Sequence, residues 1–346
     1  MAPGPGKPSF FGPLALGIAL YLCVEPLVFR RSAFGRLASP SGSTGRVIEV
    51  LRRNESPASG GPREVLVVGD SRMAEGFSAE RASSPDLAFV NAAVPGSSLR
   101  IWHYLVRELD PSARRFAAIV IPTLCFEDHD LGDYESADPA GRGYDLRFCA
   151  PLLGIGDLLE FASSFPTLEE QVQAARGVLL RGFAYKHDLQ AAFTSPFERI
   201  RELRRPFAVS DRSAAEYDGR DQEAAAADQE LARRTVARSH PAAVVADYRE
   251  RWFSLLLARH AGSPTKILVI QVPRGPVAGP RPEVQTTSVL RRLASAGKVT
   301  LLRDELFLDL ERGDRFFDSL HLNRAGRHEF SARLAREVGP LVTKGR

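Results

Sequence analysis

The chain has 346 residues, of which 25% are charged and 44% hydrophobic, and its formal net charge is +4. This composition is ordinary for a globular protein, and the length allows one large or two ordinary domains. The basic residues are scattered among nearly as many acids, and no Lys/Arg run is interleaved with aromatics, so we expect no nucleic-acid partner. The three cysteines form no C-x-x-C pair, which argues against a zinc site or thioredoxin-type chemistry.

The N-terminal segment 9–29 is apolar apart from Glu25 and a few small polar residues. About 20 apolar residues span a bilayer, and no small-x-small cleavage site follows the run. We therefore expect residues 1–31 to be a membrane anchor or an uncleaved signal, with a buried helix as the alternative. Residues 32–62, which are rich in Ser, Gly and Pro, are expected to be a linker with one short helix near 46–53.

Residues 63–346 are expected to form an α/β domain. Five buried strands are predicted at 65–68, 87–91, 116–122, 266–272 and 298–302. Helices are predicted at 74–82, from Ser97 or Ser98 through Asp110, at 282–296 and at 323–338. The alternation predicts a three-layer α/β/α fold around a parallel five-stranded sheet, flavodoxin-like in class.

Between 124 and 263 the β pattern stops, which predicts a long helical insertion. Helices are predicted at 151–163, 167–180, 214–237 and 241–260, with 194–212 as a connection. Such an insertion is a common place for a lid or a substrate-binding element. The alternative is that it only covers the sheet or packs on a partner.

Two places in the sequence can carry nucleophilic chemistry. The stretch 65–72 reads VLVVGDSR, so Ser71 follows a predicted buried strand at the sheet edge where α/β proteins bind ligands. Its alternative role is that of a helix N-cap. Near the other end of the chain, Asp318 and His321 stand three residues apart in a loop that enters a helix. An Asp–His pair suits the activation of a serine hydroxyl, which is a poor nucleophile alone.

Three sequence blocks in this order resemble the SGNH/GDSL hydrolase superfamily: G-D-S at 69–71, N-x-x-x-P-G at 91–96 and D-x-x-H at 318–321. The blocks frame nearly everything beyond the linker. The resemblance implies an SGNH-hydrolase-like fold at 63–346, with the helical insertion at about 124–263.

The resemblance also implies site roles. Ser71 would be the nucleophile, His321 the general base and Asp318 the residue that orients the imidazole. The backbone N–H groups of Ser71 and Gly96 would form an oxyanion hole. This chemistry needs no metal and no organic cofactor.

Two positions depart from the family pattern. The family places an Asn after the third strand as a further oxyanion donor, whereas this chain has PTLCFED at 122–128. Either Thr123 donates instead, or the oxyanion hole is weaker. Arg72 replaces the usual Leu after the nucleophile. It either binds an anionic or polyhydroxyl substrate or pairs with Glu75 or an insertion carboxylate, and we favour the pairing.

The resemblance implies a serine-dependent esterase or O-acyltransferase that acts on cell-surface carbohydrate or lipid esters. The substrate would be an acylated small molecule or polysaccharide, and a membrane acyl-donor protein could be a partner. Lys7 precedes the apolar segment and Arg30 follows it with further arginines, so the positive-inside rule alone places the body in the cytoplasm. The resemblance favours a membrane-anchored protein on the extracytoplasmic, periplasmic face.

Two readings from other classes stay open. One is a catalytically degenerate binding or assembly protein of the cell envelope on the same scaffold, suggested by the missing Asn. The other is a phosphate-binding protein that uses the helix N-terminus after Gly69, although the Gly-rich loop and Lys of a P-loop are absent. Cys125 and Cys149 are either a disulfide or two buried thiols.

The remaining candidates are weaker. Arg274, in a Pro-flanked loop after the fourth predicted strand, is expected to enter the cleft, with a surface turn as the alternative. An acidic loop could bind a cation or line the mouth of the cleft, although a solvated loop is favoured; it contains Glu127, Asp128, His129, Asp130 and Asp133. His103 and His328 are expected to pack rather than to react.

Overall fold

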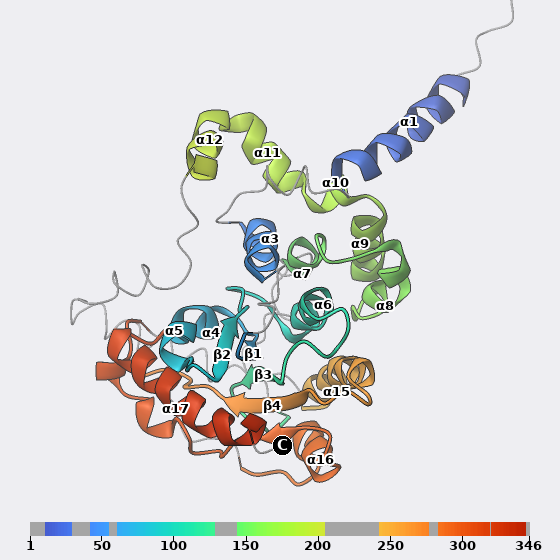
Figure 1. The fold of residues 1–346 in the computed structure, drawn as a ribbon. Coiled ribbons are helices and arrows are strands. Elements are labelled where there is room, and N and C mark those ends of the chain that lie inside the picture. Colours follow the sequence, from blue (N-terminus) through green and yellow to red (C-terminus); the bar gives the residue numbers. More distant parts are fainter. Residues whose placement is uncertain are drawn as a thin grey trace, which may run out of the picture.

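Five parallel strands form one sheet in the order β2-β1-β3-β4-β5 (Figure 1). The strands are β1 (Arg63–Val67), β2 (Leu87–Asn91), β3 (Ala118–Thr123), β4 (Lys266–Gln271) and β5 (Thr300–Leu301). Every neighbouring pair is parallel. The predicted five-stranded parallel sheet is therefore confirmed, and its strand order is that of doubly wound α/β folds.

The computed structural model describes residues 11–29, 42–54, 61–128, 144–204, 242–276, 283–318 and 320–343. The helix predicted at 214–237 lies outside these ranges, as does much of the linker. The acidic loop is described only as far as Asp128, so the predictions for His129, Asp130 and Asp133 also fall outside.

The sheet is buried on both faces, because strands β1 to β4 alternate between two apolar cores. Along β1, Leu66 belongs to one core, whereas Val65 and Val67 belong to the other. The core that contains Leu66 is covered by α6 (Leu99–Leu109), α15 (Ala242–Arg259) and α16 (Val289–Ser295), and the opposite core by α4 (Ser71–Gly76), α5 (Ala79–Ala82) and α17 (Arg324–Thr343). Two helical layers thus enclose the strands.

The single helix predicted at 74–82 is wrong, because two short helices occupy this part of the chain. Helix α4 ends at Gly76, and Phe77 then takes an extended conformation. Ser78 starts α5, and its hydroxyl accepts the N–H of Arg81 at 3.4 Å. A poor helix former followed by an N-cap residue breaks the helix here.

Between β3 and β4 the described residues form helices, but these helices differ from the predicted ones. They are α7 (Tyr144–Cys149), α8 (Leu158–Ala162), α9 (Leu168–Leu179), α10 (Arg181–Ala184), α11 (Lys186–Thr194), α12 (Pro196–Arg204) and α15, with a 3₁₀ turn at Ile155–Asp157. The single helix predicted at 151–163 is wrong, since Gly154 and Gly156 leave only the turn and α8 there. The connection predicted at 194–212 begins instead as a helix, with Pro196 at its first position.

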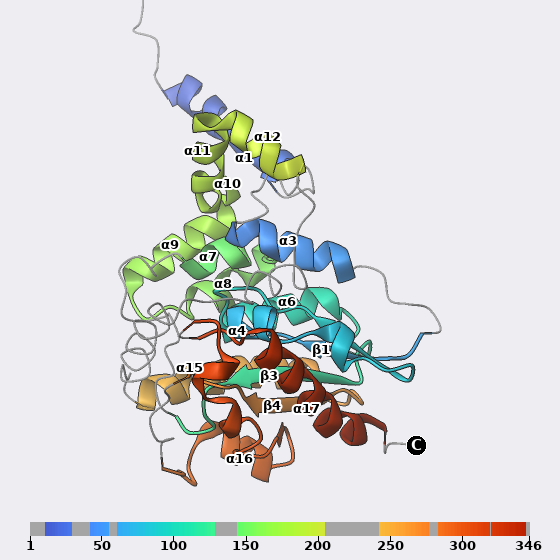
Figure 2. The same cartoon turned by 90° about the vertical axis from the view of Figure 1, so that its left-hand side faces the viewer.

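Two helices precede the sheet, α1 (Phe11–Phe29) and α3 (Ser43–Asn54). In the described part of the chain, none of the helices combines the length and the apolar character that crossing a bilayer requires. The predicted transmembrane segment is therefore not supported. Helix α1 meets the insertion at α10 (Figures 1 and 2). At this contact the buried carboxylate of Glu25 accepts the N–H of Arg181 at 2.5 Å.

The cysteines carry free thiols. Cys125 and Cys149 are buried, and Cys23 on α1 is exposed. Of the two alternatives for Cys125 and Cys149, the structure has the buried thiols and no disulfide between them.

Candidate active site

Ser71 stands at the carboxyl edge of the sheet, as the first residue of α4. The turn before it requires glycine: Gly69 has φ +153°, and a Cβ there would lie 2.4 Å from Cγ of Met73. Asp70 caps the helix, because its Oδ1 accepts the N–H of Arg72 at 2.9 Å. The strand, the glycine turn and the cap together hold the Ser71 side chain at the edge where ligands bind in α/β folds.

His321 lies in the loop that leads into α17. Asn323 starts that helix, with its Oδ1 accepting the N–H of Gly326 at 2.9 Å. Gly326 lets the chain approach closely, since a Cβ there would lie 2.3 Å from the carbonyl oxygen of Arg315. These local contacts hold the loop independently of its contact with Ser71.

Ser71, His321 and Asp318 form one hydrogen-bonded chain. Nε2 of His321 lies 2.8 Å from Oγ of Ser71, although 250 residues separate the two in sequence. On the other side of the ring, Nδ1 of His321 lies 2.8 Å from Oδ2 and 3.0 Å from Oδ1 of Asp318. With Nδ1–H donated to the carboxylate, Nε2 is left to accept the Ser71 hydroxyl proton.

The carboxylate of Asp318 is itself held in place. Its Oδ1 accepts the backbone N–H of Leu320 at 2.8 Å and of His321 at 2.7 Å. Burial raises the pKa of Asp318, but the hydrogen bond and charge of His321 and these two backbone bonds outweigh burial, so the pKa lies below its usual value. Asp318 is therefore an ionised, oriented partner for the ring.

The surroundings of His321 favour its protonated form. Burial lowers the pKa of the imidazole, but the hydrogen bond and charge of Asp318, with the charges of Glu75 and Asp70, outweigh burial and raise it above the ordinary value. One oxygen of Glu75 lies 3.9 Å from Nε2. An imidazole in this setting takes a proton readily, as a general base must.

The charge of Glu75 gives a pH test. In Glu75→Gln, the loss of a negative charge beside the ring should lower the pKa of His321, so the acid limb of the kcat/KM–pH profile for an activated acetyl ester should move to lower pH. Glu80→Gln, on the exposed side of neighbouring α5, is the control and should leave the limb in place. If the acid limb of Glu75→Gln stayed at the wild-type pH or moved to higher pH, the proposed effect of Glu75 on the pKa of His321 would be contradicted.

The second motif block is bonded to the Ser71 turn. The carbonyl of Gly69 accepts the N–H of Val94 at 2.8 Å and the hydroxyl of Ser97 at 2.9 Å. The indole N–H of Trp102, on α6, donates in turn to Ser97 Oγ at 2.7 Å. Gly96 lies within this turn at φ +77°, a conformation that suits glycine. The loop expected to supply the second oxyanion donor is therefore fixed against the loop of the nucleophile.

Asn91 has a structural use in the same block. Its side-chain amide donates to the carbonyl of Met73 at 3.2 Å and of Phe77 at 3.0 Å, and its Oδ1 accepts the N–H of Ala93 at 3.1 Å. It thereby ties the end of β2 to α4. This is a positioning contact, since none of these bonds is made to Ser71 or His321.

The hydroxyl of Thr123, the expected substitute for the missing Asn, already has two hydrogen-bond partners. Its hydroxyl donates to the carbonyl of Cys125 at 2.8 Å and accepts from Nη2 of Arg249 at 2.9 Å. Its proton is thus committed within the loop after β3. The prediction of Thr123 as a substitute oxyanion donor is not supported, because a hydroxyl has only one proton to give.

Among the described residues, Arg72 pairs neither with Glu75 nor with an insertion carboxylate, and its charged partner is Asp70. The Nη1 atom of Arg72 lies 3.9 Å from Oδ2 of Asp70. The Nε atom is buried and has no hydrogen-bond partner among the described residues. Arg72 lines a cavity beside Ser71, so its contact with a substrate stays a prediction.

Arg274 does not line the cavity beside Ser71. It is 4% exposed and is clamped by Glu311, whose carboxylate accepts from Nη2 at 2.8 Å, from Nε at 3.1 Å and from the backbone N–H at 3.1 Å. The prediction of Arg274 as a substrate-binding residue is therefore not supported. A bidentate pair buried on both sides already satisfies this charge.

The described part of the acidic loop is structural rather than solvated. Glu127 is 2% exposed and accepts from Nε of Arg291 at 2.5 Å, and Asp128 is 6% exposed and accepts the N–H of Val289 at 2.9 Å. These carboxylates fasten the loop to α16 and the residues before it. In the described ranges, no cluster of three or more ligating side chains could hold a metal.

His103 packs in the core as expected, next to the rings of Tyr104 and Trp252. Burial, with the charges of Arg107 and Arg259, lowers its pKa to about 4. His328 lies half-buried on α17. Neither residue takes part in the Ser71 hydrogen-bond chain.

Arg249 was not among the residues expected near the site. The side chain is 4% exposed and also donates to the carbonyls of Glu127 at 2.5 Å and Cys125 at 3.0 Å. A signal was present, because Arg249, Phe253 and Leu256 follow the i, i+4, i+7 spacing of a buried face. Glu75 and Trp102 carried no comparable signal.

Comparison of the chain with known proteins found no relative. No protein-family model, curated protein or solved structure matches the chain. What the site can do must therefore be argued from its own atoms: a hydroxyl, an imidazole and a carboxylate in hydrogen-bond contact at the edge of a parallel sheet.

Proposed function

We propose that the chain is a serine-dependent esterase or O-acyltransferase that works through an acyl-enzyme on Ser71. The observation that carries the proposal is the hydrogen-bond chain from Ser71 Oγ to Nε2 of His321, at 2.8 Å, and on to Asp318. A hydroxyl within this distance of an oriented neutral imidazole can lose its proton as it attacks.

In the first half of the reaction, Oγ of Ser71 would attack the ester carbonyl carbon while its proton moves to Nε2 of His321. The charge of Asp318 stabilises the imidazolium that forms. His321 then returns the proton to the departing alcohol oxygen as the C–O bond breaks, which leaves the acyl group on Ser71.

In the second half, His321 would take a proton from water or from an acceptor hydroxyl, which attacks the acyl-enzyme and frees Ser71. Water gives hydrolysis, and a second alcohol gives acyl transfer. The N–H groups of Ser71 and Gly96 are the proposed donors to the oxyanion. Such preorganised donors contribute about 3–4 kcal/mol each in comparable acyl-transfer sites.

The substrate implied by the sequence resemblance, an ester on a cell-surface carbohydrate or lipid, stays part of the proposal. An envelope location and a membrane acyl-donor partner also stay proposals. The phosphate-binding alternative is weakened, because the carboxylate of Asp70 already occupies the first turn of α4, which is only six residues long.

A fluorophosphonate probe tests the proposal directly. An activated serine displaces fluoride from phosphorus and retains the phosphonyl group, and mass spectrometry of the peptides should locate the adduct on Ser71. A binding or assembly protein with a degenerate site would not be labelled. Product analysis with and without an added saccharide would then separate transfer from hydrolysis.

A further inference from the structure

A small cavity lies next to Ser71, but none of the three residues of the hydrogen-bond chain lines it. Asp70 and Arg72, on either side of Ser71, both line it. Leu99 and Trp102, which follow Gly96 on α6, form another part of the wall. The cavity therefore lies against both loops that are proposed to supply oxyanion donors.

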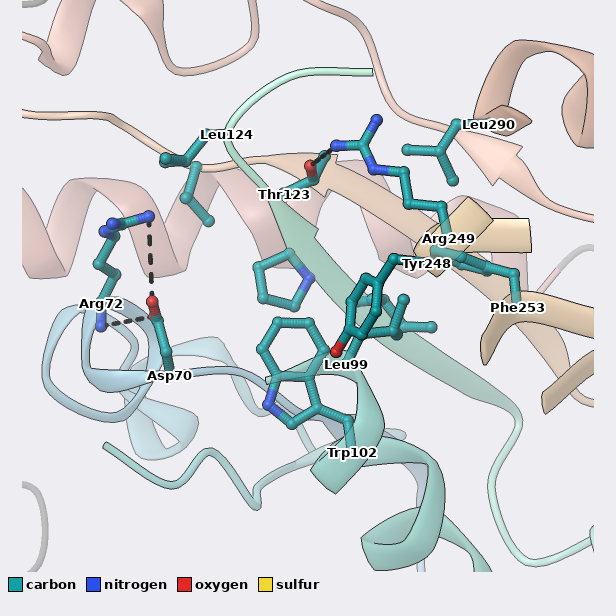
Figure 3. A pocket seen from close by; sticks show the side chains of 13 residues that line it. Asp70, Arg72, Leu99, Trp102, Thr123, Leu124, Tyr248, Arg249, Phe253 and Leu290 are labelled. Carbon is teal, nitrogen blue, oxygen red and sulfur yellow. Dashed lines mark hydrogen bonds and ion pairs between the residues drawn. The ribbon is translucent and has the colours of Figure 1, made fainter. Parts of the chain in front are cut away.

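The far wall comes from the helical insertion. Tyr248 and Phe253 of α15 close the cavity opposite the Asp70–Arg72 pair, and Leu290 of α16 adds to the lining (Figure 3). Most of the other lining residues are apolar, from the ends of β3 and β4. An apolar lining next to a reacting carbonyl suits the hydrocarbon part of an acyl group better than it suits a sugar.

The charges on the wall do not call for an anionic ligand. Arg72 faces the carboxylate of Asp70, so this pair has no net charge. Arg249 also lines the cavity, but its guanidinium is committed to the loop after β3, including the carboxylate of Asp128 at 3.3 Å. An uncharged acyl group meets no unbalanced charge there.

The cavity is small and two of its walls are fixed. Its volume is ≈ 40 Å³, and roughly 10–15 Å³ holds one water molecule, so about three heavy atoms fit. The Trp102 ring is held by its bond to Ser97, and the hydroxyl of Tyr248 accepts the N–H of Arg100 at 2.9 Å. Turning either ring away would break its hydrogen bond.

We infer that this cavity is the acyl-binding pocket and that it restricts the substrate to short, uncharged acyl groups of about two to four carbons. This inference rests on the proposed function and adds the class of acyl group that Ser71 would accept. It also gives the insertion a role, because α15 supplies the wall that limits the length of the chain.

The test is the acyl-chain profile of kcat/KM with p-nitrophenyl acetate, butyrate, hexanoate and octanoate. The wild-type chain should prefer acetate or butyrate over octanoate by at least about tenfold. Leu290→Ala and the milder Leu99→Val enlarge the cavity and should raise the hexanoate-to-acetate ratio by about tenfold. Each ratio is taken on one preparation, so partial misfolding of a variant cancels.

Leu293→Ala is the matched control. Leu293 is buried on α16, three residues from Leu290, and it does not line the cavity. This variant should keep the wild-type ratio. A flat wild-type profile, a preference for succinyl esters or enlarged variants with an unchanged ratio would overturn the acyl-pocket inference while the esterase proposal stands. Absence of both turnover and fluorophosphonate labelling would reject the proposed function itself.

Discussion

Ser71→Ala should lower kcat for p-nitrophenyl acetate by about 10⁴-fold or more, to near the uncatalysed rate. The variant lacks the only atom that the proposed mechanism uses to carry the acyl group. His321 could still deprotonate a water molecule, so a small residual rate is compatible with the proposal. The measurement is steady-state hydrolysis, with fluorophosphonate labelling on the same samples.

The fold should survive this change. The Ser71 side chain makes a part-buried hydrogen bond to His321, whose loss costs about 1 kcal/mol in the free energy of unfolding. Circular dichroism and a thermal melt would confirm an intact protein. Ser295→Ala, an exposed serine at the end of α16, is the matched control and should keep full turnover. Unchanged hydrolysis in Ser71→Ala would end the acyl-enzyme mechanism.

Asp318→Asn should lower kcat by roughly 10²- to 10⁴-fold. The amide oxygen of Asn can still accept the N–H groups of Leu320 and His321, so the loop should keep its shape. The amide cannot stabilise an imidazolium as a carboxylate does, and it can donate to Nδ1, which leaves the proton on Nε2, where the base must be free. KM should change little, because the loss falls on the transition state.

A pH profile distinguishes this role from a structural one. The carboxylate of Asp318 raises the pKa of His321. In Asp318→Asn the acid limb of the kcat/KM–pH profile should therefore move to lower pH, in addition to the loss of rate. Asp314→Asn is the control, since that carboxylate is 58% exposed and pairs only with neighbouring arginines among the described contacts. If Asp318→Asn kept the wild-type kcat and the wild-type acid limb of the pH profile, the aspartate would be dispensable.

Local patterns predicted much of the fold. The apolar run at 65–68 forms a strand because only the interior of a sheet buries it on both faces, and β2 begins and ends where its pattern predicted. Thr167 was predicted to open a helix, and it caps α9 in a reciprocal bond with Glu170. These outcomes depend on residues within a few positions of one another, which the sequence displays directly.

Charged side chains were harder to predict. Arg274 follows a strand at the edge where ligands bind, yet it is neutralised by Glu311 from a different loop. Arg249 and Asp128 meet across 121 residues. No local pattern reveals such partners, because a buried charge pairs with whatever the folded chain brings close.

The sequence by itself determined the parallel sheet, the glycine turn before Ser71 and the presence of a serine, an aspartate and a histidine in a suggestive order. Only the tertiary structure decided that Nε2 of His321 reaches Ser71 and that α15 closes a cavity beside it. The physical reason is how far apart in the sequence the contacting residues lie. Strands, turns and caps follow from contacts between near neighbours, whereas a site requires the sheet to bring together side chains that lie hundreds of residues apart.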